Sequence, residues 1–295
     1  MYRIIVVTAA CLLLSCIGNI SSETDAPISE EDFYTIDGPT DDATTESTIN
    51  EDNEEGEMVS RQKRTIYGYE VNDYDYPYVV SIRVDYRSHY CGGTILTPKL
   101  ILTAAHCLDE YQISYVVVSN NYPKYYYKVA YYIKYPYYHH DKYIMANDIA
   151  LLVLEQSIPN AQTVSLQPYP QNVTNEILAY ALGWGDTENR FMSQNLRRVD
   201  VPFLHPSQCQ SNKELNQRIV CIDTRKGNVC SGDSGGPLMY GNIQVGVTSY
   251  VTGPPSKYPW VKPRVFDMCM SGMPAFFTRI SAYYTWIQGY VQKYR

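Results

Sequence analysis

A serine between glycines, in residues 230–237, is the clearest candidate for chemistry in this chain. Ser234 follows an acidic residue, Asp233, and precedes two glycines that leave room for a substrate backbone. Gly232 can adopt backbone angles that turn its N–H inward, so the N–H groups of Gly232 and Ser234 can bind the negative oxygen of a tetrahedral intermediate. The pattern therefore predicts a nucleophilic serine beside an oxyanion hole.

The same run also satisfies the G-x-S-x-G pattern of α/β-hydrolases, because Gly232, Ser234 and Gly236 have that spacing. Chain order separates the two interpretations. An α/β-hydrolase has an acid and then a histidine after its serine, and this sequence has no histidine after Ser234. His106 and Asp148 instead precede Ser234, and each is a polar residue inside an apolar, strand-like run.

The order His106, Asp148, Ser234 resembles that of the trypsin/chymotrypsin family of serine proteases. The resemblance extends over about residues 65–295. Further motifs that carry it are Cys91-Gly92-Gly93, Gly183-Trp184-Gly185 and Thr278-Arg279-Ile280. It implies that Ser234 attacks a scissile carbonyl while His106 transfers the proton, and that Asp148 holds the imidazole tautomer.

The sequence pattern predicts short β-strands around these residues, and therefore an all-β fold. Between residues 76 and 154, β-branched and aromatic residues alternate with turn residues, which is typical of a small antiparallel barrel. Similar runs follow a crossover at residues 155–175. We therefore expect two six-stranded antiparallel β-barrels, over about residues 77–155 and 175–280, with the active site in the cleft between them.

A C-terminal α-helix is expected over about residues 281–294, with Ser281 as its N-cap. Apolar and aromatic side chains recur there at helical spacing, which indicates one face packed on the barrels. They are Tyr283, Ile287, Tyr290, Val291 and Tyr294.

The first 64 residues differ in composition from the rest. Residues 1–20 have the pattern of a secretory signal peptide, since a short apolar stretch follows Arg3. Residues 21–64 carry 14 acidic and three basic residues and few large apolar ones, so they are expected to be a disordered propeptide. We expect a secreted, extracellular product with no membrane anchor and no nucleic-acid partner.

The resemblance implies a site of proteolytic activation between Arg64 and Thr65. A cut after Arg64 by a convertase or another protease would free the α-amino group of Thr65, which would pair with Asp233 and order the oxyanion hole. A cut that makes Ile66 the first residue fits less well, because it must follow a threonine. His89 matches a family position that can hold Asp233 before cleavage.

Six cysteines remain after the expected signal peptide, an even number that suits an oxidising compartment. Their spacing alone allows 15 pairings. The resemblance implies one of them, Cys91–Cys107, Cys209–Cys221 and Cys230–Cys269.

The residues that the resemblance assigns to the specificity pocket are Asn228, Ser249, Val251 and Ala275. Trypsin-like cleavage needs an aspartate at the pocket floor, where Asn228 offers only a dipole. Val251 narrows the pocket, so we expect neutral, small or medium side chains to be preferred. The segment 252–268 is longer than the segment that usually connects the pocket wall to the disulfide cysteine in this family. Its basic residues predict a positively charged rim beside the cleft.

No cofactor or metal is expected. Residues 111–140 contain no Asp or Glu, so the calcium loop of trypsin-like enzymes has no carboxylates here. Asn172 lies in an acceptor sequon for glycosylation. The expected partners are a protein or peptide substrate, the activating protease and protein protease inhibitors.

Two functional hypotheses remain at this stage. The first is a secreted serine endopeptidase made as a zymogen. The second is a weakly active or non-catalytic binding protein with the same fold, which would use its tyrosines, concentrated at residues 111–143, and the 252–268 loop. Labelling of Ser234 by a serine-reactive probe separates the two hypotheses.

Overall fold

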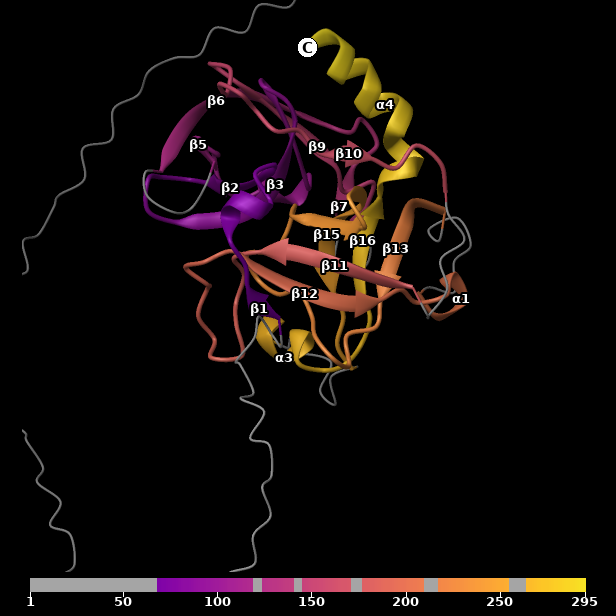
Figure 1. The fold of residues 1–295 in the computed structure, drawn as a ribbon. Helices are drawn as coiled ribbons and strands as arrows, with labels where there is room; N and C mark the ends of the chain where they lie inside the picture. The colour runs from indigo at the N-terminus through magenta and orange to yellow at the C-terminus, as the bar shows by residue number, and fades with distance from the viewer. Residues whose placement is uncertain (1–67, 119–123, 141–144, 171–176, 210–216, 255–263) are drawn as a thin grey trace, which may run out of the picture. The chain divides into compact units, whose positions relative to one another are not determined.

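The computed structural model describes residues 68–118, 124–140, 145–170, 177–209, 217–254 and 264–295. Within these ranges β-strands are the main regular secondary structure, and the chain ends in a long helix (Figure 1). This confirms the predicted all-β fold with a C-terminal helix. The propeptide and signal regions lie outside the described residues.

Six antiparallel strands of the first half close into a barrel in the order β2-β3-β4-β9-β6-β5. Their bounds are β2 Val79–Arg83, β3 His89–Thr97, β4 Leu100–Thr103, β5 Tyr115–Val118, β6 Tyr125–Lys134 and β9 Ala150–Leu154. Every residue of β4 and β9 is buried, which matches their continuous apolar sequences. Between these strands lie η3 (His106–Leu108) and the short β7 (His139–His140) and β8 (Met145–Ala146).

Two polar residues of β2 are buried without breaking the barrel. Ser81 accepts a hydrogen bond from Arg83 Nε, and the Arg83 guanidinium also donates to the backbone carbonyls of Tyr86 and Arg87. A buried polar group is tolerated where its hydrogen bonds are satisfied.

The second half forms a sheet in the order β1-β12-β11-β14-β15-β16-β13, with β10 parallel to β15. Its strands are β1 Tyr69–Glu70, β10 Ser165–Leu166, β11 Leu178–Gly183, β12 Arg197–Pro202, β13 Ile219–Ile222, β14 Pro237–Tyr240, β15 Ile243–Val251 and β16 Ala275–Arg279. An antiparallel bridge between Phe203 and Ile222 joins the end of β12 to β13. The second half is therefore an eight-stranded sheet in which this isolated bridge links β12 to β13, and β1 and β10 are additions to the predicted six strands.

Glycine at position 92 lets the two halves approach closely. A Cβ atom on Gly92 would lie 2.9 Å from Gly236 Cα, which is too close for any side chain. Nearby, the buried Thr94 hydroxyl donates to Gln244 Oε1 at 2.8 Å. The halves are therefore joined by polar as well as apolar contacts.

The helices are few. Besides η3, the described residues contain η2 (Asp73–Asp75), α1 (Pro206–Cys209), α3 (Val265–Cys269) and α4 (Ile280–Lys293). The face of α4 that carries Tyr283 and Ile287 is buried and packs against β15 and β10. Ser281 is not the N-cap, because the helix begins one residue earlier, after Arg279, and places Ser281 inside its first turn.

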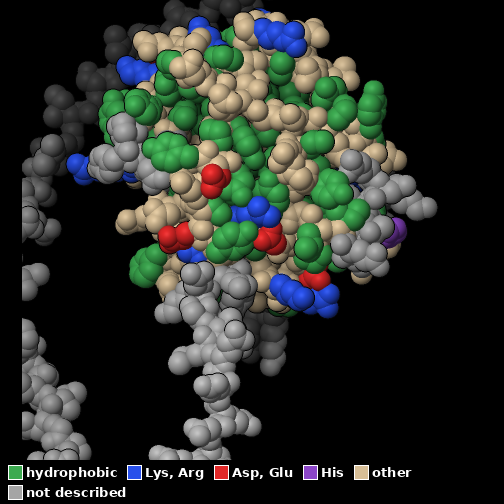
Figure 2. Space-filling view, in the orientation of Figure 1, with side chains coloured by type: hydrophobic (Ala, Val, Ile, Leu, Met, Phe, Trp, Pro, Cys, Tyr) green, Lys and Arg blue, Asp and Glu red, His purple; other side chains and the backbone are tan. Residues whose placement is uncertain are grey.

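Many tyrosines lie on the surface. On β6, Tyr131 and Tyr132 are both exposed because the pairing with β9 shifts register between Val129 and Tyr131, so strict alternation is lost. On the face in Figure 2, hydrophobic side chains, the class that includes tyrosine, are green and lie among other side chains and backbone in tan. None of the helices in the described ranges has the length and apolar character needed to cross a membrane.

Candidate active site

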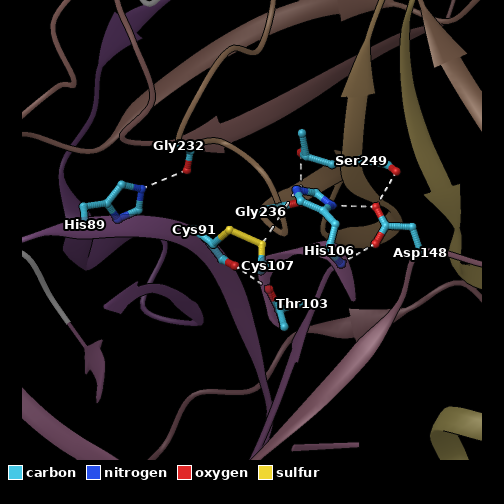
Figure 3. Close-up of a disulfide and its surroundings, with 11 residues drawn as sticks. His89, Cys91, Thr103, His106, Cys107, Asp148, Gly232, Gly236 and Ser249 are labelled. Atoms are coloured by element: carbon cyan, nitrogen blue, oxygen red, sulfur yellow. Dashed lines mark hydrogen bonds and ion pairs between the residues drawn. A yellow bond between two sulfur atoms is a disulfide. The ribbon is translucent and has the colours of Figure 1, made fainter. Parts of the chain in front are cut away.

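His106 and Asp148 are brought together by two neighbouring strands. His106 follows β4 and Asp148 precedes β9, and these strands pair so that Thr103 lies opposite Ala150. The imidazole Nδ1 lies 2.8 Å from Asp148 Oδ2, and the backbone N–H of His106 donates to Oδ1 at 2.9 Å (Figure 3). Both carboxylate oxygens therefore orient His106.

Asp148 is held from the second half as well. The Ser249 hydroxyl donates to Oδ2 (Figure 3), and Thr278 Oγ1 donates to the Asp148 backbone carbonyl at 2.7 Å. Only 1% of Asp148 is exposed. A buried carboxylate with these donors is confined to one orientation.

The two side chains stabilise each other's charged forms. Burial alone would raise the pKa of Asp148, but the His106 charge and hydrogen bonds outweigh it, and that pKa is lowered. Burial alone would lower the pKa of His106, but attraction to Asp148 outweighs it, and that pKa is raised. An imidazolium formed at His106 is thus favoured by its surroundings.

Ser234 lies on a tight segment before β14. Gly232 and Gly235, on either side of it, have φ angles of 93° and 77°, which side chains rarely permit. The Ser234 carbonyl accepts a hydrogen bond from Gly92 N at 2.7 Å, which ties this segment to β3 of the first barrel. Ser234 and His106 line the same cavity.

Three disulfides are present among the described residues. They join Cys91 to Cys107, Cys209 to Cys221, and Cys230 to Cys269. These are the pairs that the resemblance implies. The first adjoins His106 (Figure 3) and the third adjoins the segment that carries Ser234, so both brace the cavity.

His89 holds the carbonyl of Gly232. Its Nε2 lies 2.8 Å from Gly232 O (Figure 3), so this nitrogen carries the proton, and Nδ1 accepts from the Ser81 hydroxyl at 2.8 Å. Burial lowers the pKa of His89 to about 4, so the ring is neutral. In this arrangement His89 binds Gly232 and not Asp233, the partner suggested by the sequence.

Asp233, which directly precedes Ser234, is buried. Its carboxylate accepts hydrogen bonds from Gly185 N at 2.8 Å and Cys230 N at 2.9 Å. Burial raises the pKa of Asp233 to about 6 despite these two donors. A cation placed beside it would be strongly attracted.

The cavity has a volume of about 410 Å³. Of the residues assigned to the specificity pocket, Ser249 and Val251 line it. Asn228 and Ala275 are fully buried and are not among the described residues that line it. The Asn228 amide instead donates to Cys269 O at 2.8 Å, so it supports the wall from behind.

Several residues that line the cavity were not predicted from the sequence, and four of them show why. Val265 and Met268 come from α3, inside the 252–268 insertion, and Tyr90 and Glu110 lie on the side of His106. The length of the insertion was visible in the sequence, but nothing there indicated that a helix would turn these two side chains toward the cavity.

Several predicted positions lie outside the described residues. They are Arg64 and Thr65 at the activation junction and Asn172 at the sequon. Among the described residues, one grouping brings metal-type donors close together, Cys91, Cys107 and His106. Both sulfurs are in a disulfide, so this grouping does not form a metal site.

Comparisons with known proteins match most of this chain. A sequence model of the trypsin family matches residues 65–287. Human chymotrypsin-like elastase family member 1 is 32% identical over 255 residues, which cover 77% of this chain and 92% of that protein. Hypodermin-B of Hypoderma lineatum is 30% identical over 252 residues, covering 76% and 86%. The solved structure of human heparin binding protein shares the fold, with a TM-score of 0.62 at 24% identity over 76% of this chain and 95% of that chain.

Proposed function

The chain belongs to the trypsin family and is a serine-type endopeptidase, and from this premise we propose that His106, Asp148 and Ser234 are its catalytic triad. The observation that carries the proposal is the double hydrogen bond from His106 to Asp148, with Ser234 lining the same cavity as the imidazole. Triad residues act as a unit, so each position should be essential.

The hydrogen bond to Asp148 sets the proton on His106 Nδ1, because a carboxylate only accepts. His106 Nε2 is then free to take the proton of the Ser234 hydroxyl as that oxygen attacks the scissile carbonyl. The imidazolium gives the proton to the leaving amine, and a water molecule then repeats the sequence on the acyl-enzyme.

The N–H groups of Gly232 and Ser234 form the oxyanion hole in this proposal. Both residues line the cavity, and the positive φ of Gly232 is the conformation expected for an inward N–H. The hydrogen bond from His89 to the carbonyl oxygen of Gly232 holds the backbone of this residue in place.

Activity should fall in mild acid as His106 becomes protonated. A general base must be neutral, and the pKa of His106 is raised, so the acid limb of kcat/KM should have its midpoint above 6.5, the ordinary value for histidine. The pH profile of kcat/KM on an uncharged peptide measures this midpoint. A midpoint below 6.5 would count against the assignment of His106 as the base.

Cleavage after Arg64 is the proposed activation step. The family match begins at Thr65, and the segment that follows is anchored at Gly68, whose carbonyl accepts from the buried Arg197 at 2.8 Å. The freed α-amino group of Thr65 would pair with the buried Asp233 carboxylate. That ion pair would lower the pKa of Asp233 and order the adjacent Gly232.

Arg64→Gln should block this step. Without the buried ion pair, peptide hydrolysis should be roughly 10²- to 10³-fold weaker, as expected for a missing partner of a buried charge. As the control, the same domain released from a fusion so that Thr65 is its first residue should be fully active. Full hydrolysis by uncleaved Arg64→Gln protein would refute the activation proposal.

The proposed specificity is for neutral, small or medium side chains. The described lining of the cavity includes the apolar side chains of Val229, Val251, Val265 and Met268, and its one carboxylate, Glu110, is exposed. A buried Lys or Arg of a substrate would meet no counter-charge there.

Val251→Gly should widen this pocket. The ratio of kcat/KM for Phe over Ala peptides should rise by about tenfold, the scale set by one or two methylene-sized contacts. Leu178→Ala, an exposed position on β11 away from the cavity, is the matched control and should leave the ratio unchanged. An unchanged ratio in Val251→Gly would place the specificity pocket elsewhere.

Export and processing complete the proposal. Three disulfides fit an oxidising compartment, and residues 1–20 and 21–64 would serve as signal peptide and acidic propeptide. Glycosylation at Asn172 is proposed on its sequon alone. Mass spectrometry of protein secreted by host cells would show an N-terminus at Thr65 and a glycan on Asn172.

A further inference from the structure

Asn147, which directly precedes Asp148, has a backbone conformation that most residues avoid. Its φ angle is 55°, in the left-handed region, where asparagine is tolerated because its short polar side chain can hydrogen-bond locally. The Asn147 carbonyl also accepts a hydrogen bond from Ile149 N at 2.9 Å, which closes a three-residue turn centred on Asp148. Such a conformation persists where the surroundings hold it in place.

The side-chain amide of Asn147 is held by three separate parts of the chain. Its Nδ2 donates to the Tyr137 carbonyl at 2.6 Å. Its Oδ1 accepts from Arg218 Nη1 at 2.7 Å and from the Tyr283 hydroxyl at 2.8 Å. Tyr137 lies between β6 and β7, Arg218 directly precedes β13, and Tyr283 is on α4. The amide therefore ties the turn to segments from both halves of the fold.

Tyr283 is a buried partner in this arrangement. Only 3% of it is exposed, and its ring packs edge-on against Tyr135 with the centroids 4.9 Å apart. Burial raises the pKa of Tyr283, so its hydroxyl stays protonated and donates to Asn147. The backbone N–H of Tyr135 donates to the Ile149 carbonyl at 3.0 Å. Residues on both sides of Asp148 are therefore held in place.

We propose that Asn147 is a positioning residue of the active site, whose amide holds this turn so that the Asp148 carboxylate keeps both hydrogen bonds to His106. These two bonds, at 2.8 and 2.9 Å, reach different carboxylate oxygens, so they require one orientation of the carboxylate (Figure 3). A displacement of about 1 Å in such a group can lower the rate about a hundredfold. The inference rests on the proposed triad, because Asn147 acts only through Asp148.

Asn147→Ala removes the amide and its three hydrogen bonds, so the turn should relax. In protein cleaved after Arg64, kcat should fall about tenfold to a hundredfold, while KM for an uncharged peptide changes by less than about twofold. KM should be kept because Asn147 is not among the described residues that line the cavity. Values of kcat are expressed per Ser234 labelled to completion by a sulfonyl fluoride probe, so misfolded protein does not enter them.

The titration of His106 distinguishes positioning from a general loss of structure. Burial lowers the pKa of His106, and attraction to Asp148 outweighs it. A displaced carboxylate should therefore lower the midpoint of this titration in Asn147→Ala. Asp109 and Glu110, which also raise the pKa, are unchanged in the variant. The midpoint is measured from the acid limb of kcat/KM and, without any need for hydrolysis, by NMR of the ring, which His106→Gln assigns among the five histidines.

Asn160→Ala is the matched control. Asn160 is also an asparagine in the left-handed region, with a φ angle of 52°, and it is exposed and outside the described lining of the cavity. Its replacement should leave kcat within about twofold and the His106 midpoint unchanged. Tyr283→Phe keeps the buried ring and removes one donor to Asn147, so kcat should fall about threefold to tenfold.

A kcat of Asn147→Ala within about twofold of the native value would show that Asp148 is held without this amide, and would overturn the inference. If Asn147→Ala does not fold, the same result in Tyr283→Phe overturns it. A fall in kcat with an unchanged His106 midpoint also does so, because the effect would then not pass through Asp148. Absence of hydrolysis by the native cleaved enzyme contradicts the proposed triad instead, and the NMR midpoint then decides alone whether Asn147 orients the carboxylate.

Discussion

Replacement of Ser234 by alanine is expected to lower kcat by about 10⁴- to 10⁶-fold, because the variant has no nucleophile to form an acyl-enzyme. Substrate binding should change little, since the walls of the cavity are untouched. The measurement is steady-state hydrolysis of an uncharged peptide by protein already cleaved after Arg64.

The control is Ser165→Ala on β10, an exposed serine outside the cavity, which should retain activity within about twofold. The Ser234→Ala protein should fold normally because the carbonyl of residue 234, not its hydroxyl, ties the segment to Gly92. Residual activity above about one per cent in Ser234→Ala, in protein free of contaminating protease, would remove Ser234 as the nucleophile.

Asp148→Asn is expected to lower kcat by about 10⁴-fold. An amide at this position presents an N–H to His106 Nδ1, and the imidazole then carries its proton on Nε2, where it cannot accept the proton of Ser234. The backbone of residue 148 is still held by Thr278, so the fold should persist. The rate of peptide hydrolysis at neutral pH tests the expected loss of kcat. A near-ultraviolet circular dichroism spectrum tests whether the fold persists.

Ser249→Ala provides a graded comparison. It removes one hydrogen bond to the Asp148 carboxylate but leaves the charge, so the loss should be about tenfold to a hundredfold, far smaller than for Asp148→Asn. Asp200→Asn, an exposed carboxylate paired with Arg198, is the matched control and should stay within about twofold. Similar activities of Asp148→Asn and Asp200→Asn would show that Asp148 does not orient the base.

Chain order and local motifs were sufficient to predict the all-β fold and to single out His106 and Asp148. Each of these two residues adjoins an apolar run, β4 or β9, and such runs pair inside a barrel. Pairing of strands thus converts a long separation in sequence into a 2.8 Å contact. The motif Cys91-Gly92-Gly93 also reflects a contact between distant segments. Residue 92 must be glycine because Gly236 approaches it too closely for a side chain.

Contacts between distant segments could not be predicted in the same way. The bond from Ser249 to Asp148 depends on how two β-structures pack, and no local pattern encodes it. The inward position of Met268 depends on the short helix α3, which has too few residues for a periodic signal. Helix α4 begins before Ser281 because residue 279 ends β16 directly at the helix, which leaves no separate capping residue.

The central claim is that the hydroxyl of Ser234 is activated by His106. The most direct measurement treats protein cleaved after Arg64 with a sulfonyl fluoride probe and locates the adduct by mass spectrometry. We predict a single adduct, on Ser234, formed at least about a hundredfold more slowly in His106→Ala, since the base accelerates attack. Rapid labelling of Ser234 in His106→Ala, or peptide hydrolysis that persists while Ser234 stays unlabelled, would contradict the claim.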